Sequence, residues 1–200
     1  MPEHLRMVPE EPPSDAPDAD LLRAFRAGDA GAFERLVERH EGALLRHLCL
    51  LTGRRAAAED ATQEAFLTLA RRPPDPSDPR VAELGLGPWL HRVARNHALD
   101  HMRTQARRRD REAALTGERP PLAPDTSLAA VDAADTRALV ERTLLALPED
   151  QREVISLRLL EERSYQEIAE ITGKKVGTVG WLISRGMRAL ARELGPLMEA

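Results

Sequence analysis

The stretch that decides the fold runs from Ser164 to Leu190 and reads SYQEIAEITGKKVGTVGWLISRGMRAL. Ser164 and Glu167 form the S-x-x-E pattern of a capping box, which marks the start of a helix. Gly173 stands where the chain has to turn, and glycine enters left-handed backbone conformations without steric cost. Apolar residues then return at helical spacing. The pattern predicts two short helices crossed as a helix-turn-helix, a motif whose second helix enters the major groove of DNA.

The polar residues of this stretch indicate how it would contact DNA. Side chains that could reach phosphates or base edges are Lys174, Lys175, Thr178, Ser184, Arg185 and Arg188. Gly180 lies inside the second helix, where a glycine costs about 1 kcal/mol of helix stability relative to alanine. The stretch predicts a DNA-binding surface whose middle part, at Gly180 and Trp181, has no basic side chain.

Composition narrows the class of protein. Aromatic residues make up 3% of the 200-residue chain and the net charge is −4, so any DNA contact has to come from local basic surfaces. No apolar run approaches the roughly 20 residues that span a bilayer. The acidic, proline-rich N-terminus is unlike a signal peptide, and the single Cys49 excludes an internal disulfide framework. These features predict a cytoplasmic protein without membrane insertion.

The chain divides into four parts by composition. Residues 1–19 are rich in proline and acids and are expected to be a disordered tail. Residues 20–112 read as a first helical domain, and residues 113–134 read as a linker. Residues 135–200 form the second domain. We therefore predict an all-α protein with two small helical domains joined by a flexible linker, the second ending in the helix-turn-helix.

Local signals place the helices of the first domain. One helix is expected to begin after Asp29 and to end at Gly53, and the next covers about residues 55–71. A proline-rich loop from Pro73 to Gly87 follows, and a third helix begins near Pro88. In the first of these helices, His40 and His47 look like ordinary helix-face residues.

Two helix faces of the first domain carry candidate binding residues. On the second helix, Asp60, Gln63, Glu64 and Leu67 share one face, which suits docking to a basic partner. The third helix carries Arg92, Arg95, Asn96, Arg103 and Arg107, which suit a phosphate backbone and a base edge. Ordinary solvated helix faces explain both patterns as an alternative. Trp89 is expected to pack in the core rather than to stack on a base.

Signals of catalysis are missing from the sequence. His97 and His101 have the i, i+4 spacing of metal ligands, but no third ligand is evident. The chain has no glycine-rich phosphate loop and no nucleophile elbow. We predict no catalytic residue, no metal and no cofactor.

Four blocks of the chain occur in an order that is similar to a known family. They read DLLRAFRAGDAGAFERLVERHEGALLRHL, AEDATQEAFLTLARR, WLHRVARNHALDHMRTQARRR and LPEDQREVISLRLLEERSYQEIAEITGKKVGTVGWLISRGMRAL. In this order they resemble the bacterial RNA polymerase sigma factors of the extracytoplasmic-function (ECF) group, from Asp20 to about Leu194. The resemblance implies a protein that binds core RNA polymerase and directs it to promoter −10 and −35 elements for transcription initiation.

The resemblance also implies roles for individual residues. Those that would dock on the β′ clamp helices of polymerase are Asp60, Gln63, Glu64 and Leu67. Those that would read and open the −10 element are Arg92, Arg95, Asn96, Asp100, Arg103 and Arg107. Tyr165 joins the six polar residues of the helix-turn-helix as readers of the −35 element. An anti-sigma factor is the expected regulatory partner.

Two other functions fit parts of the pattern. A stand-alone helix-turn-helix regulator would bind promoter DNA without polymerase, normally as a dimer on two half-sites. A sigma-derived interaction protein would have weakened −35 recognition, for which Gly180 and Trp181 are the motivation. Specific binding to promoter DNA without polymerase, or failure to support transcription with core enzyme, would favour these alternatives.

Overall fold

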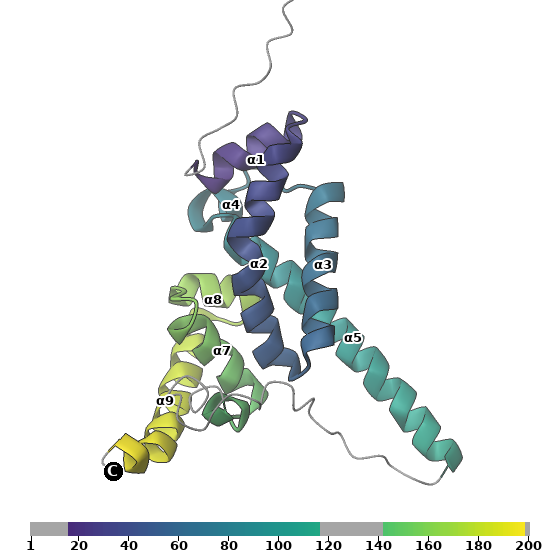
Figure 1. The fold of residues 1–200 in the computed structure, drawn as a ribbon. Coiled ribbons are helices and arrows are strands. Elements are labelled where there is room, and N and C mark those ends of the chain that lie inside the picture. The colour runs from purple at the N-terminus through teal and green to yellow at the C-terminus, as the bar shows by residue number, and fades with distance from the viewer. Residues whose placement is uncertain (1–15, 117–141, 199–200) are drawn as a thin grey trace, which may run out of the picture.

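The computed structural model describes residues 16–116 and 142–198, and every regular element in these two ranges is a helix (Figure 1). The helices with both ends in these ranges are α1 (Asp18–Arg26), α2 (Ala30–Thr52), α3 (Arg55–Arg71), α4 (Pro79–Leu84), α5 (Leu86–Thr116), α7 (Glu149–Leu159), α8 (Tyr165–Thr172) and α9 (Val176–Met198). The predicted all-α class is confirmed. Among the described helices, none combines the length and apolar character that crossing a bilayer requires.

Helices α1, α2, α3 and α5 enclose the core of the first domain. Figure 1 shows α2 and α3 side by side, with α5 crossing them and extending away from the body. Leucine dominates the fully buried positions, which include Leu21, Leu22, Leu36, Leu44, Leu48, Leu69 and Leu90. Small buried alanines on the facing sides of α3 and α5 let these two helices approach each other. Trp89 packs against this core, as predicted.

Local signals set the bounds of the two central helices. The Asp29 carboxylate accepts a hydrogen bond from the Ala32 amide at 3.3 Å and caps the start of α2. Gly53 ends α2 with a φ of 66°, in the left-handed region. The helix expected over about residues 55–71 is α3, Arg55–Arg71.

The fold begins earlier than expected. Helix α1 starts at Asp18, inside the stretch expected to be a disordered tail, and Ala16 is already buried. Asp18 explains the difference, because its carboxylate binds Arg39 Nη1 at 2.6 Å and His40 Nε2 at 2.8 Å. These contacts hold the start of α1 against α2. The proline content of residues 1–19 gives no indication of partners that lie about twenty residues further along the chain.

The proline-rich loop also contains a helix. Helix α4 lies within the stretch from Pro73 to Gly87 that was expected to be irregular, so that expectation is wrong for residues 79–84. Asp78 caps α4 by accepting a hydrogen bond from the Arg80 amide at 2.9 Å, and Pro79 occupies the first turn. Val81 anchors the helix in the core.

Helix α5 runs four residues into the expected linker. It continues through Thr116, so residues 113–116 are helical. The rest of the expected linker, residues 117–134, and most of the expected tail, residues 1–15, lie outside the described residues.

The helix-turn-helix occupies the second domain. The Ser164 side chain accepts a hydrogen bond from the Glu167 amide at 3.2 Å, and Glu167 accepts one from the Ser164 amide at 2.8 Å. Gly173 turns the chain with a φ of 69°. The capping box and the turn are therefore confirmed. Apolar side chains of α7, α8 and α9 form the core, including Val154, Ile155, Ile168, Ile171, Val179, Leu182 and Ile183.

The two domains pack directly against each other. Helix α8 lies along α5, and α7 lies along α2. Leu50, at the end of α2, is buried in the core of the second domain. Two domains joined by a flexible linker were expected, without any prediction of contact between them. The packing between them depends on charged and buried polar side chains, which a search for apolar periodicity does not find.

Candidate nucleic-acid interface

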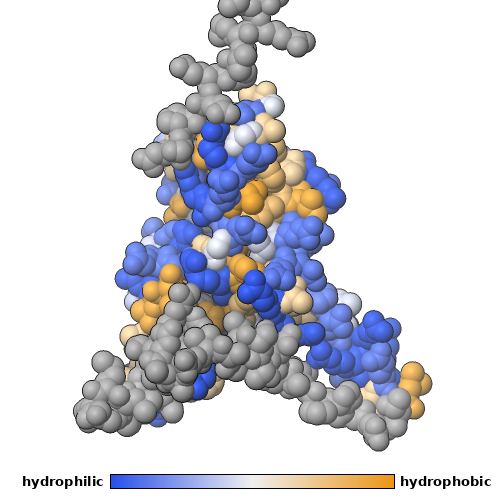
Figure 2. Space-filling model, in the orientation of Figure 1, coloured by the Kyte–Doolittle hydropathy of each residue, from blue (hydrophilic) through white to orange (hydrophobic). Residues whose placement is uncertain are grey.

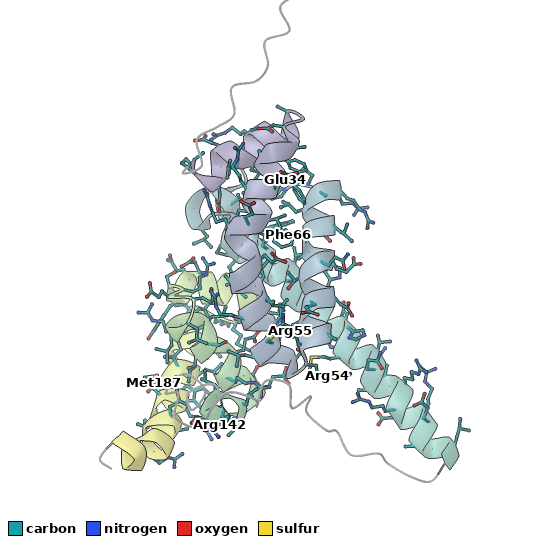
Figure 3. All side chains as sticks on the ribbon, viewed as in Figure 1. Glu34, Arg54, Arg55, Phe66, Arg142 and Met187 are labelled. Carbon is teal, nitrogen blue, oxygen red and sulfur yellow. The ribbon has the colours of Figure 1, made fainter. Side chains whose placement is uncertain are left out.

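The acidic face of α3, Asp60, Gln63, Glu64 and Leu67, is accessible. The first three side chains are exposed, whereas Leu67 is half-buried rather than exposed. Neither Asp60 nor Glu64 forms an ion pair within the described part of the chain. Phe66 points the other way and packs in the core (Figure 3). Unpaired carboxylates around a partly apolar residue suit a basic partner surface.

The outer part of α5, residues 103–116, protrudes from the molecule. Figure 2 shows it as hydrophilic apart from its tip. Arg103 and Arg107 are both exposed, and Arg103 Nη1 pairs with the Asp100 carboxylate at 3.0 Å. Asn96, two turns before Arg103, is exposed as well. Guanidinium groups on an open helix can approach a phosphate backbone without rearrangement.

The inner part of α5 differs, because its arginines pair with carboxylates of other helices. Arg95 binds the Glu153 carboxylate with two hydrogen bonds, from Nε at 2.5 Å and from Nη2 at 3.1 Å. Arg92 Nη1 binds the Glu170 carboxylate. Both carboxylates belong to the second domain, so the structure brings Arg92 and Arg95 against it and leaves Asn96, Asp100, Arg103 and Arg107 exposed.

A buried polar cluster lies between α2, α5 and α7. Glu153 is 2% exposed, and burial alone raises the pKa of its carboxyl. Interaction with His47 and Arg95 outweighs burial and brings the pKa of Glu153 down to about 2. His47 Nε2 lies 3.6 Å from Glu153 Oε1, which is an ion-pair distance. Glu153 is therefore an anion that neighbouring basic groups hold in the interior.

Sequence reasoning missed this cluster. His40 and His47 were expected to be ordinary helix-face residues, and that expectation is wrong because both are buried. Both lie on the side of α2 that carries Leu44 and Leu48, so helical spacing could have revealed them. Glu153 directly precedes buried Val154, which was the only local signal of its burial.

The helix-turn-helix presents most of its predicted residues to solvent. Exposed among them are Tyr165, Lys175, Thr178, Ser184, Arg185 and Arg188. Lys174 is half-buried, and its Nζ binds the Asp150 carboxylate at 2.7 Å, within the second domain. Lys174 is the one member of the predicted set that forms an ion pair within the described part of the second domain.

Gly180 and Trp181 have a structural explanation. Helix α9 is continuous through Gly180, and a Cβ there would lie 3.5 Å from the Tyr165 ring. Trp181 is 55% exposed, and the Arg185 guanidinium lies 5.3 Å from the centre of its ring. A shallow hollow borders Trp181, Arg185, Arg188 and Arg192. The part of α9 without a basic side chain thus carries an aromatic surface flanked by arginines.

Metal chemistry finds no support in this geometry. No group of three or more histidine, cysteine, aspartate or glutamate side chains suited to a metal occurs in residues 16–116 and 142–198. His97 instead lies 3.4 Å from Thr68 Oγ1, where α5 crosses α3. The chemistry of the described surfaces is that of charge and stacking.

Comparisons with known proteins agree with this geometry. Residues 36–108 match the family described as Sigma-70 region 2, and residues 137–190 match the family described as Sigma-70, region 4. The ECF RNA polymerase sigma-E factor of Haemophilus influenzae is 32% identical, over 90% of this chain and 97% of that protein. The ECF RNA polymerase sigma factor SigM of Mycobacterium tuberculosis is 33% identical, over 90% of this chain and 86% of that protein. BldN of Streptomyces coelicolor is 31% identical, and the chain spans 65% of its length.

Two solved structures share the fold. The first is CnrH in complex with the cytosolic domain of CnrY, with a TM-score of 0.63, 24% identity, and coverage of 90% of this chain and 97% of that one. The second is the sigma factor RpoE in complex with the anti-sigma factor NepR from Bartonella quintana. Its TM-score is 0.61 and its identity 24%, over 82% of this chain and 96% of that one.

Proposed function

The chain belongs to the ECF RNA polymerase sigma factors, and from this premise we propose that it binds core RNA polymerase and directs it to promoters. The main observation in support is that Sigma-70 regions 2 and 4 follow each other on one chain and that each has an exposed charged surface. The protein then makes and breaks no covalent bond. It supplies binding energy that places polymerase at a promoter and stabilises the opened strand.

Docking on polymerase uses the acidic face of α3. Asp60, Gln63 and Glu64 approach a basic surface of the core enzyme, and Leu67 supplies a partly apolar contact. Support comes from the absence of ion pairs to Asp60 and Glu64 within the described residues, so little has to be broken on docking. Complementary charge speeds association and fixes register more than it adds affinity.

Recognition of the −10 element uses α5. The residues assigned to it are Arg92, Arg95, Asn96, Asp100, Arg103 and Arg107. Arginines bind the phosphates of the non-template strand, and Asn96 offers an amide to a base edge. Taking a base out of the stack costs a few kcal/mol, which these contacts offset.

Recognition of the −35 element uses α8 and α9. The residues assigned to it are Tyr165, Lys174, Lys175, Thr178, Ser184, Arg185 and Arg188. Exposure of most of these side chains supports the assignment. Linked recognition of two promoter elements gains from effective concentration, so neither domain needs to bind tightly alone. A stand-alone regulator would leave the acidic face of α3 without a use.

Regulation by an anti-sigma factor is part of the proposal. RpoE and CnrH, which share this fold, were each solved in complex with another protein, and for RpoE that protein is an anti-sigma factor. We place the protein in the cytoplasm, where polymerase and promoter DNA are found. The single Cys49, which is buried, fits a reducing compartment.

Run-off transcription with purified core polymerase tests the proposed function. The expected result is a promoter-specific transcript that requires both the chain and the core enzyme. A gel shift with promoter DNA alone is the control and should show weak binding. No specific transcript on any promoter mapped by sequencing of bound DNA would contradict the proposal.

A further inference from the structure

The outer face of α9 carries one large apolar side chain in its first two turns. The exposed residues from position 177 to position 184 are Gly177, Thr178, Trp181 and Ser184, and Trp181 alone among them is bulky. Its side chain is 55% exposed, although tryptophan usually has most of its ring buried. In a helix-turn-helix, the N-terminal residues of the second helix are the ones that contact base edges. Trp181 therefore stands at a base-reading position, yet it is not among the −35 residues assigned above.

The positions around Trp181 leave it room to approach DNA. Gly177 lies one turn earlier, and a Cβ there would meet no heavy atom within 4 Å. Gly180 directly precedes Trp181, and a Cβ there would meet only the Tyr165 ring, at 3.5 Å. Glycine lets a helix backbone come close to a ligand. With no side chain at either position, α9 can enter a groove until the indole of Trp181 meets the base edges.

Arginines hold the indole from its C-terminal side. The Arg185 guanidinium lies over the Trp181 ring, 5.3 Å from its centre, in a cation–π contact. Arg188 and Arg192 follow at helical spacing on the same face and border the same shallow hollow. Tryptophan has only two side-chain torsions, so little entropy is lost when this contact orients it. The face thus combines an oriented aromatic ring with groups that bind phosphates on either side of a groove.

The chemistry of the indole decides which feature of a base pair it can read. Its ring offers a single N–H donor and no acceptor, so most of its surface makes apolar contacts only. In the major groove, the C5-methyl group of thymine is the apolar feature that distinguishes one base from the others. Stacking on a base face is not available, because the bases of a duplex are stacked on each other. The methyl group of a thymine is therefore the complement of this side chain.

We propose that Trp181 is a specificity-determining residue of the −35 surface, which selects a thymine by apolar contact with its C5-methyl group. Gly177 and Gly180 permit the approach, and Arg185 orients the ring. The inference rests on the proposed function for the placement of α9 in the major groove. It assigns Gly180 and Trp181 to promoter recognition, in place of the weakened recognition that their lack of charge suggested.

Replacement of single thymines by deoxyuridine tests the contact. Deoxyuridine pairs with adenine as thymine does and lacks only the methyl group. Each thymine of the −35 element, on both strands, is replaced in turn, in a promoter mapped by sequencing of bound DNA. Affinity is measured with the chain assembled on core polymerase. One replacement is expected to weaken binding about fourfold, which is the effect of one methyl group no longer buried.

Variants of the chain assign that effect to the indole. With Trp181→Ala, thymine and deoxyuridine at the sensitive position should bind equally well, and Trp181→Phe should keep part of the difference. Met187→Ala is the matched control, because Met187 is an exposed apolar residue about 120° away around α9 (Figure 3). It should keep the full difference. Each variant is compared with itself on two DNAs, so a loss of active protein cancels from the ratio.

The outcomes separate the inference from the proposed function. Promoter-specific binding without any methyl-sensitive thymine would overturn the role of Trp181 alone. So would a sensitive thymine whose effect persists in Trp181→Ala, because another side chain would then contact the methyl group. An equal loss of affinity for both DNAs at every position in Trp181→Ala would limit Trp181 to supporting Arg185, and would also refute the inference. Absence of any promoter preference with core polymerase would overturn both the inference and the proposed function.

Discussion

His47 Nδ1 lies 3.1 Å from His91 Nδ1, in the buried space between α2 and α5. Only one of the two facing nitrogens can carry a proton at this distance, since the other has to accept the hydrogen bond. Both Nε2 atoms are buried without a hydrogen bond in the described structure. His47 also lies beside Glu153, whose Oε1 is 3.6 Å from His47 Nε2, so the pair belongs to the buried cluster between α2, α5 and α7.

The first prediction concerns pH. Burial, followed by the charges of His47, Arg163, His40 and Arg46, holds the pKa of His91 well below its ordinary 6.5. At pH values between the lowered pKa of His91 in the folded chain and its ordinary pKa in the unfolded chain, the unfolded chain binds a proton that the folded chain does not. As far as His91 is concerned, the free energy of unfolding is therefore highest above pH 6.5. Below pH 6.5 it falls by up to about 1.4 kcal/mol per pH unit.

Urea unfolding at a series of pH values between about 5 and 8 measures this effect. His91→Gln should flatten the dependence, and exposed His101→Gln should leave it unchanged. Equal slopes for the unsubstituted chain and His91→Gln would rule out His91 as the source.

The second prediction concerns polymerase docking. Reversing two charges with Asp60→Arg and Glu64→Arg should weaken binding to core polymerase at least about tenfold, because like charges then face each other. Fluorescence anisotropy with labelled chain and purified core enzyme measures the affinity. Glu34→Arg combined with Glu38→Arg is the matched control, because it changes the net charge equally at two exposed positions on α2, of which Figure 3 labels Glu34. An unchanged affinity in the double variant would remove the acidic face from the interface.

The third prediction contrasts two glycines of α9. At Gly180 an added Cβ makes ordinary contact with Tyr165, so Gly180→Ala should stabilise the domain by about 0.5–1 kcal/mol. At Gly186 the Cβ would lie 2.2 Å from Ile155 Cδ1, inside the core, so Gly186→Ala should destabilise it by about 1–3 kcal/mol. Chemical denaturation measures both. Stabilisation by both substitutions would show that helix propensity, not packing, governs α9, and destabilisation by both would contradict the open environment of Gly180.

The fourth prediction concerns the aromatic surface of α9. Arg185→Ala removes a phosphate contact and should reduce the slope of log affinity against log salt by about one. Trp181→Ala removes no charge and should leave the slope unchanged, whatever it does to affinity. Binding of the polymerase complex to promoter DNA over a salt series measures both. If the two variants share one slope, Arg185 does not contact phosphate.

Local chemistry could be predicted from the sequence, and distant pairing could not. Asp29, Gly53, the Ser164 capping box and Gly173 act on backbone within a few residues, so their patterns identify helix ends. Exposure of Asp60 followed from helical spacing for the same reason. The ion pair of Arg95 with Glu153 joins residues 58 positions apart, and no local pattern encodes such a partner. The docking of the two domains was therefore missed.

Helix α5 is anchored at one end only. Leu90, Ala94 and Ala98 lie in the core, whereas most side chains from Arg103 to Leu115 are exposed. An isolated helix of that length is marginal in water and loses helicity on warming. If α5 binds promoter DNA as proposed, ordering this segment costs conformational entropy, and that cost grows with temperature. On the proposed role of α5, promoter affinity would therefore depend on temperature through this outer half of the helix, which pairs one turn apart, such as Arg108 with Glu112, stabilise.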